Sequence, residues 1–244
     1  MDRIKVRLIN YTPRPLETVT WAALISYWDK WESEAFERTT KSDVEKHLPK
    51  VLSYGHESIL EHAVFTFAIE GCSRVCSHQL VRHRIASYTQ QSHRYIKLNP
   101  QDIEETFLIP ESIKEKPKLY EKWKKLMKDA IELYKETCGD DIHQEDARYI
   151  LPQAVRTKIV VTMNLRELKH FFGLRTCERA QWEIREVAWK MLNEIAKVEE
   201  LRPIVQWAKL GPRCIQLGYC PEKDLMPKGC FKRTREKWSK IAEI

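Results

Sequence analysis

The sequence predicts an α+β protein, that is, a single α/β domain in which long helices pack on a small sheet. The 244-residue chain is 43% hydrophobic and 10% aromatic, which supplies enough apolar side chain for one sizeable core. Short segments of alternating polarity predict strands, and longer segments with apolar residues every three to four positions predict helices. No repeat, low-complexity tract or linker interrupts the chain, so we expect one domain over residues 1–244.

In the N-terminal third, two segments predict strands. Residues 4–9 alternate apolar and charged side chains, and residues 64–70 (VFTFAIE) are rich in β-branched and aromatic types. Helices are predicted over residues 18–28, 42–53 and 58–63. Ser42 followed by Glu45 has the pattern of a helix capping box, so Ser42 is the predicted N-cap of the second helix.

Most of the remaining chain predicts helices. They are expected over residues 73–84, 118–137, 144–151, 164–172 and 178–197. Asn164 is the predicted N-cap of the helix that Gly173 ends, with Glu167 at its third position. Residues 85–95 lack periodicity and predict an ordered loop, and residues 203–244 form a tail rich in Cys and Lys.

Charge and cysteine content narrow the class of protein. The net charge of +7 favours a polyanionic partner, either nucleic acid or a phosphorylated small molecule. The seven cysteines are an odd number, which argues against a secreted disulfide framework, and Cys72 and Cys76 are expected to pack in a helix. Cys214, Cys220 and Cys230 match no standard zinc spacing, so we expect no metal; disulfides there remain open.

Neither a membrane span nor a signal peptide is expected. No apolar run approaches the ~20 residues that a membrane-spanning helix needs. The first residues lack the apolar stretch of a signal peptide, so we expect a cytoplasmic protein.

The densest polar cluster spans residues 79–94. It contains three arginines, two histidines, three glutamines and two serines, a donor set suited to phosphate or to an anionic ring. Favourable cations at a helix C-terminus would account for Arg82 and Arg84, but not for the polar residues that continue beyond them. The seven glycines form no phosphate-binding glycine motif, so side chains must hold any phosphate.

Within this cluster, Arg82-His83-Arg84 followed seven residues later by Ser92 resembles the signature of flavin-dependent thymidylate synthases. Further blocks occur in the order found in that family, and the resemblance is strongest over residues 20–195. These blocks are Gly55-His56-Glu57-Ser58, Glu61-His62, Arg148, Asn164, Arg166, Arg175 and Gln181-Trp182-Glu183-Ile184.

The resemblance implies the family fold, a homotetramer with active sites shared between chains, and reductive methylation of dUMP to dTMP. FAD is the implied cofactor, and NADPH and methylenetetrahydrofolate are the co-substrates. The implied FAD-binding residues are Ser26, Ser58, Glu61, Arg82, His83, Arg84, Gln90, Asn164, Arg166 and His170. No membrane or nucleic-acid partner is then expected.

The same resemblance implies a dUMP site and two residues close to the chemistry. The implied dUMP-binding residues are Gln79, Arg82, Gln90, Gln91, Ser92, His93, Arg94, Arg148 and Arg175. Arg175 would face the uracil and favour loss of its N3 proton, and His56 would lie near the flavin and folate. The chain departs from common family residues at Gln90 (Glu), His93 (Gly) and His170 (Asn).

Two other functions fit parts of the sequence. A basic RNA-binding or RNA-modifying module would use a cationic tail made of Lys228, Lys232, Arg233, Arg235 and Lys237. A hydrolase would hold a metal at His62, His78 and His83, although these histidines lack metal-ligand spacing on one helix face.

Overall fold

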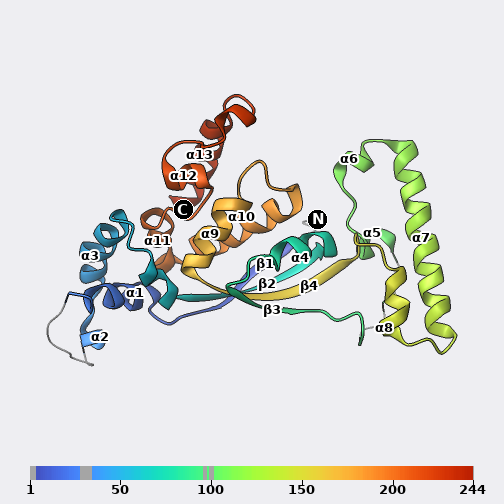
Figure 1. Cartoon of the computed structure of the whole chain (residues 1–244), viewed down its shortest axis with the longest axis horizontal. Coiled ribbons are helices and arrows are strands. Elements are labelled where there is room, and N and C mark those ends of the chain that lie inside the picture. The colour runs from blue at the N-terminus through green and yellow to red at the C-terminus, as the bar shows by residue number, and fades with distance from the viewer. Residues whose placement is uncertain (1–3, 28–34, 96–97, 99–101, 244) are drawn as a thin grey trace. The chain divides into compact units, whose positions relative to one another are not determined.

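The computed structural model describes residues 4–27, 35–95, 98 and 102–243. It contains helices and a four-stranded antiparallel sheet, which confirms the predicted α+β class (Figure 1). The strands lie in the order β1-β2-β4-β3. They are β1 (Lys5–Tyr11), β2 (Val64–Ser73), β3 (Ala86–Gln90) and β4 (Arg156–Asn164). The expected strands at residues 4–9 and 64–70 are both present as β1 and β2.

The other two strands differ from the sequence analysis. The predicted loop over residues 85–95 is wrong in its first half, because residues 86–90 form the edge strand β3. This strand is polar (ASYTQ), so its sequence shows none of the apolar alternation that a core-facing strand shows. No element is predicted at β4, where Thr157, Ile159, Val161 and Met163 are nevertheless buried on one face with period two.

Contacts within the chain divide the structure into two compact units. Unit 1 contains the described residues within 1–5, 69–82 and 88–160, and unit 2 contains those within 6–68, 83–87 and 161–244. All four strands contribute residues to both units, and the chain passes from unit 1 to unit 2 between Arg82 and His83. The expected single domain over residues 1–244 therefore stays a prediction.

The helices of unit 1 begin with α4 (Arg74–Leu80), where the Ser73 hydroxyl accepts a hydrogen bond from the Cys76 amide. Because α4 ends at Leu80, the helix predicted to reach residue 84 is too long, and Arg82 and His83 do not share a helical face with Gln79. Cys76 on α4 and Cys72 on β2 are both fully buried. The expected helix is therefore confirmed for Cys76 and wrong for Cys72, which packs from a strand.

The other helices of unit 1 surround a small apolar core. They are α5 (Ile103–Thr106), α6 (Glu111–Lys114), α7 (Pro117–Gly139), α8 (Gln144–Ala147) and the 3-10 helix η2 (Arg148–Ile150). Phe107, Met127, Ile131 and Val155 form the core cluster, and Trp123 packs edge-on against Phe107 with 6.2 Å between ring centroids. The helix α7 is present as its periodicity predicts, and Met127, Ile131 and Tyr134 of its apolar face are buried, whereas Leu119 and Leu126 are exposed.

Unit 2 contains the remaining helical elements. They are α1 (Pro15–Leu24), α2 (Ala35–Arg38), α3 (Lys41–Ser53), η1 (Ser58–His62), α9 (Leu165–Arg175), α10 (Trp182–Lys197), η3 (Glu199–Leu201), α11 (Arg202–Trp207), α12 (Arg213–Leu217), η4 (Lys223–Leu225) and α13 (Cys230–Ala242). Helix α1 begins before residue 18 because Pro15 occupies its first turn. The predicted end of this helix at Trp28 lies outside the described residues. The N-cap of α3 is Thr40, paired with Asp43 in a capping box, so the prediction of Ser42 is wrong.

Helices α9 and α10 form the centre of unit 2. Asn164 is the N-cap of α9, as predicted, but the helix continues through Gly173 to Arg175. Gly173 is needed for close packing rather than for ending the helix, because a Cβ there would lie 3.0 Å from Gln216 Nε2. The side chain of Gln181 caps α10, which therefore begins at Trp182 instead of residue 178.

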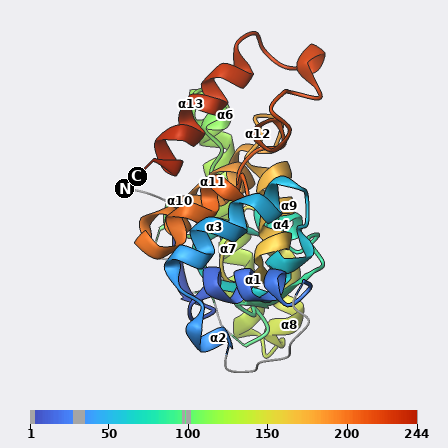
Figure 2. The ribbon, with the colours of Figure 1, turned by 90° about the vertical axis from the view of Figure 1, so that its left-hand side faces the viewer.

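The C-terminal segment folds as part of unit 2, and α13 packs on α10 and α11 (Figure 2). The Trp238 indole N–H donates to the Leu210 carbonyl at 2.6 Å, and the adjacent Gly211 has no room for a Cβ beside that ring. Among the described helices, none is both long enough and apolar enough to cross a membrane.

Candidate functional site

In unit 2, side chains of α9 contact His83, the central residue of the Arg-His-Arg motif. His83 Nδ1 lies 3.2 Å from Glu167 Oε1, and the Arg175 Nε–H donates to His83 Nε2 at 3.1 Å. Phe171 packs edge-on against the imidazole at a centroid distance of 4.9 Å. Burial, and to a smaller extent the nearby Arg175 and His170, together lower the pKa of His83 to about 4. His83 is therefore neutral near pH 7, and its contact with Glu167 is a hydrogen bond rather than an ion pair.

Polar side chains of the predicted FAD set gather on the exposed surface formed by η1 and α9. Arg166 on α9 pairs with Glu61 on η1, and Lys169 pairs with Glu57 just before η1. Each helix also contributes an exposed donor: Ser58 at the start of η1 and His170 in the middle of α9. The His170 ring lies 5.7 Å from that of His83. Other predicted residues of unit 2 are also exposed: Ser26, His56 and Arg84.

In unit 1, hydrogen bonds fix the start of the predicted dUMP loop, residues 90–94. The Gln90 amide N–H₂ group donates to Ser77 Oγ at 2.9 Å and to Thr157 Oγ1 at 3.1 Å, joining β3 to α4 and β4. The Arg74 side chain donates to the backbone carbonyl of Gln91 at 3.0 Å, and the backbone N–H of Gln91 donates to the backbone carbonyl of Lys158 at 2.9 Å. The amide nitrogen of Gln90 is thus engaged inside the protein.

The rest of this loop carries a buried imidazole among arginines. His93 is 4% exposed, and its burial, together with the nearby Arg74 and Arg148, lowers its pKa to about 4. Arg94 pairs with Glu145 at 2.6 Å, and Arg148 donates to the Glu145 carbonyl at 3.0 Å. The structure thus brings together Gln90, Gln91, His93, Arg94 and Arg148 of the predicted dUMP set.

Arg74 and Glu167 are among the residues of these networks that the sequence did not predict as site residues. Arg74 supports the loop and lies near His93, but it precedes the polar cluster in the sequence. Glu167 has the spacing of a capping residue, and its amide does bond to Asn164 Oδ1 at 2.8 Å, yet its carboxylate contacts His83. A buried helix-start acid that follows a motif histidine by 84 positions gives no recognisable signal in the sequence.

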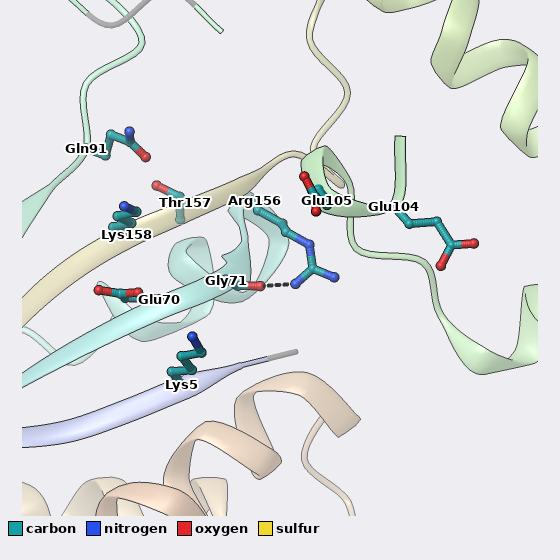
Figure 3. A pocket seen from close by; sticks show the side chains of 9 residues that line it. All are labelled: Lys5, Glu70, Gly71, Gln91, Glu104, Glu105, Arg156, Thr157 and Lys158. Carbon is teal, nitrogen blue, oxygen red and sulfur yellow. Dashed lines mark hydrogen bonds between the residues drawn. The ribbon is translucent and has the colours of Figure 1, made fainter. Parts of the chain in front are cut away.

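A cavity of about 540 Å³ in unit 1 opens beside this loop (Figure 3). Figure 3 shows Lys5, Glu70 and Lys158 projecting from β1, β2 and β4, and the Arg156 guanidinium donating to the Gly71 carbonyl at 2.7 Å. Its lining combines three cations with three carboxylates, which gives no net preference for a phosphate. Gln91 is the residue of the predicted dUMP set that reaches it.

A second cavity of about 430 Å³, in unit 2, is lined by Arg175 and four cysteines, namely Cys177, Cys214, Cys220 and Cys230. Burial raises the pKa of the Cys214 thiol to about 11 and also raises that of Cys177. These two thiols are protonated at neutral pH and are poor nucleophiles there. All seven cysteines are in the free thiol form.

Neither alternative function gains support from this geometry. Within the described residues, no group of three or more His, Cys, Asp or Glu side chains could hold a metal ion. Much of the cationic tail proposed for RNA lies in the folded helix α13, where Lys237 stacks 4.3 Å from the Trp189 ring centroid.

Comparisons with known proteins agree with the motif. Residues 7–199 match the family model described as thymidylate synthase complementing protein. The chain is 79% identical over 241 residues to a flavin-dependent thymidylate synthase of Thermococcus onnurineus, covering 99% of this chain and 98% of the relative. It is 75% identical over 240 residues to that of Pyrococcus abyssi, covering 98% of both chains. The flavin-dependent thymidylate synthase of Geobacter sulfurreducens is 45% identical over 219 residues, covering 90% and 91%. Motif, fold and comparisons together show that the chain belongs to the flavin-dependent thymidylate synthase family.

Proposed function

We propose that this chain methylates dUMP to dTMP in the cytoplasm, with methylenetetrahydrofolate as one-carbon donor and NADPH as the source of reducing equivalents. FAD is the proposed cofactor, and it supplies the hydride chemistry when bound. The observation that carries the proposal is the hydrogen bond of 3.1 Å from Arg175 Nε to the buried, neutral His83, within the Arg-His-Arg motif itself.

The residues of unit 2 fit a flavin nucleotide. The described chain offers no glycine-rich phosphate loop, so cationic and hydroxyl side chains must hold the diphosphate. Arg84, Arg166 and Ser58 are exposed and can serve this role, with Glu61 orienting Arg166 through their ion pair. His170 and Asn164 complete the proposed set on α9, together with Ser26 and His83 from unit 2 and Arg82 and Gln90 from unit 1.

The proposed dUMP site uses the loop of unit 1 for the phosphate, and for the base it uses an Arg175 that is proposed to come from another chain. Arg94 pairs with the Glu145 side chain and Arg148 donates to the Glu145 carbonyl, so one residue holds both guanidinium groups, which are proposed to bind the phosphate. Gln79, Arg82, Gln91, Ser92 and His93 complete the set.

Arg175 is proposed to stabilise the uracil after its N3 proton leaves. A fixed cation near a developing anion favours the charged form, and burial strengthens this effect. The Nε–H of Arg175 is used in its hydrogen bond to His83. Its two Nη groups make no hydrogen bond or ion pair within the described residues, so they can donate to a pair of coplanar acceptors on a ligand. The anionic ring is more electron-rich at C5, which favours attack on the one-carbon unit.

Ser92 is proposed to bind dUMP rather than to act as a nucleophile. Its hydroxyl oxygen accepts a hydrogen bond from the Arg94 amide at 3.2 Å, an arrangement that shapes a turn. A serine nucleophile needs a base that accepts its proton, and the Ser92 contact found here is to a backbone donor.

The oligomer is also proposed to be a homotetramer whose active sites combine residues of different chains. Closed symmetric oligomers readily form such sites at their interfaces.

The purified protein tests the cofactor assignment directly. It should be yellow, and NADPH should bleach the flavin absorbance without oxygen; a colourless protein that also failed to bind added FAD would overturn the proposal.

A further inference from the structure

Three residues of α9 lie along one stripe that faces His83. Glu167, Phe171 and Arg175 are spaced four residues apart, so successive side chains are displaced by only about 40° around the helix. Each contacts the imidazole: Glu167 and Arg175 at opposite nitrogens, and Phe171 at the ring. His83, which follows α4, is thus contacted by two turns of α9, a helix that is distant from it in the sequence.

The direction of these two hydrogen bonds is fixed by chemistry. The Arg175 guanidinium is always protonated and can only donate, so His83 Nε2 must be the acceptor. A neutral imidazole then carries its single proton on Nδ1, and this proton points to Glu167 Oε1. The hydrogen bonds therefore run in one direction: Arg175 donates to His83, and His83 donates to Glu167.

We propose that Glu167 is a positioning residue: by accepting the Nδ1 proton of His83, it selects the tautomer that can hold the Arg175 guanidinium in place for uracil. This inference rests on the proposed dUMP site and adds to it a residue outside the motif. The backbone N–H of Glu167 donates a hydrogen bond to Asn164 Oδ1 at 2.8 Å, which fixes the Glu167 backbone, and Glu167 is only 7% exposed. Arg175 ends the helix, so His83 secures a side chain that would otherwise be free to rotate.

The alternative tautomer shows why the acceptor matters. A proton on Nε2 would face the Nε–H of Arg175, and two donors would oppose each other across 3.1 Å. The guanidinium would then have to swing away. Protonation of His83 would have the same effect. Among the described residues, Glu167, His170 and Arg175 of α9 are the titratable or charged groups with a recorded interaction with it.

A double-mutant cycle on dUMP binding tests the proposal. Calorimetry on the flavin-loaded tetramer should show that Glu167→Met weakens dUMP binding about tenfold, the size of one hydrogen bond to a charged group. Glu167→Gln retains an acceptor oxygen, and its affinity should stay within about threefold of the parent chain. In an Arg175→Ala background, Glu167→Met should cost less than about twofold, because its effect passes through Arg175. Glu186→Gln, which removes an exposed partner of Lys190 on α10, is the matched control and should change nothing.

An equal loss from Glu167→Met in both backgrounds would overturn the proposal, as would a Gln variant as weak as the Met variant. Flavin content and unfolding temperature identify variants that fail for lack of folding. The unmodified chain gives an independent result even then: ¹⁵N-histidine NMR should show His83, identified through His83→Gln, as the neutral Nδ1–H tautomer at pH 7. An Nε2–H or doubly protonated His83 would refute the proposal. If the parent chain shows this tautomer but binds neither flavin nor dUMP, the proposed function fails while the hydrogen-bond chain stands.

Discussion

The two buried histidines make the stability of the fold sensitive to mild acid. His93 has a pKa of about 4 in the folded chain, because it is buried and faces Arg74 and Arg148, against about 6.5 in an unfolded chain. Between these values the unfolded chain binds a proton that the folded chain does not. Stability is therefore complete above pH 6.5 and falls as the pH drops toward 4.

The size of the effect follows from the shift. Linkage between these two pKa values gives a loss of about 2 kcal/mol at pH 5 relative to neutral pH for His93. His83 has the same lowered pKa and should contribute a similar amount in unit 2. Replacing His93 with Phe keeps a ring of similar size but removes the titration, so His93→Phe should lose about 2 kcal/mol less than the parent chain over this range.

The assay is guanidinium unfolding at pH 7.5 and pH 5.0, followed by fluorescence of the tryptophans. The quantity compared is the change in unfolding free energy between the two pH values, so the titration of carboxylates common to both chains cancels. His78→Gln, at an exposed position on α4 in the same unit, is the matched control and should behave as the parent chain does. If His93→Phe and the parent chain lose the same stability, His93 is not the buried neutral group that the structure shows.

Three further predictions concern the proposed site. Arg175→Ala should reduce dTMP formation about 10²-fold while flavin reduction by NADPH continues, and an equal loss in both half-reactions would contradict its role at uracil. Ser92→Ala should raise the Michaelis constant for dUMP and keep measurable turnover; complete inactivity in a protein that still binds dUMP and flavin would reopen the question of a serine nucleophile. Arg94→Ala and Arg175→Ala should each be nearly inactive, and mixed tetramers of differently tagged chains should recover about a quarter of the sites if the two arginines come from different chains. Background activity in proven mixed tetramers would refute the shared site.

The sequence predicted the fold where burial leaves a regular pattern. The long helix α7 follows from periodicity, and the N-cap Asn164 follows from local capping chemistry. The edge strand β3 could not be predicted in this way, because its polar residues are held by main-chain pairing in the sheet and not by burial.

The Arg-His-Arg motif likewise predicted which residues belong to the site, but not the contacts that those residues make within the chain. Arg82-His83-Arg84 predicted a ligand site from donor density, yet the neutrality of His83 depends on α9, which begins more than 80 residues later. Glu167 matched a local capping pattern, and only the packing of α9 against His83 shows its second contact. Gly173 matched a helix stop, whereas its lack of a side chain makes room for Gln216.

The balance of the proposed reaction tests the central claim most directly. Flavin-loaded protein, dUMP, methylenetetrahydrofolate and NADPH are incubated without oxygen, and the nucleotides and folates are separated by chromatography. The proposal predicts one dTMP and one tetrahydrofolate for each NADPH consumed, because the reducing equivalents of the methyl group come from NADPH and not from the folate. Formation of dihydrofolate in place of tetrahydrofolate, or NADPH oxidation with no dTMP in the flavin-loaded protein, would contradict it.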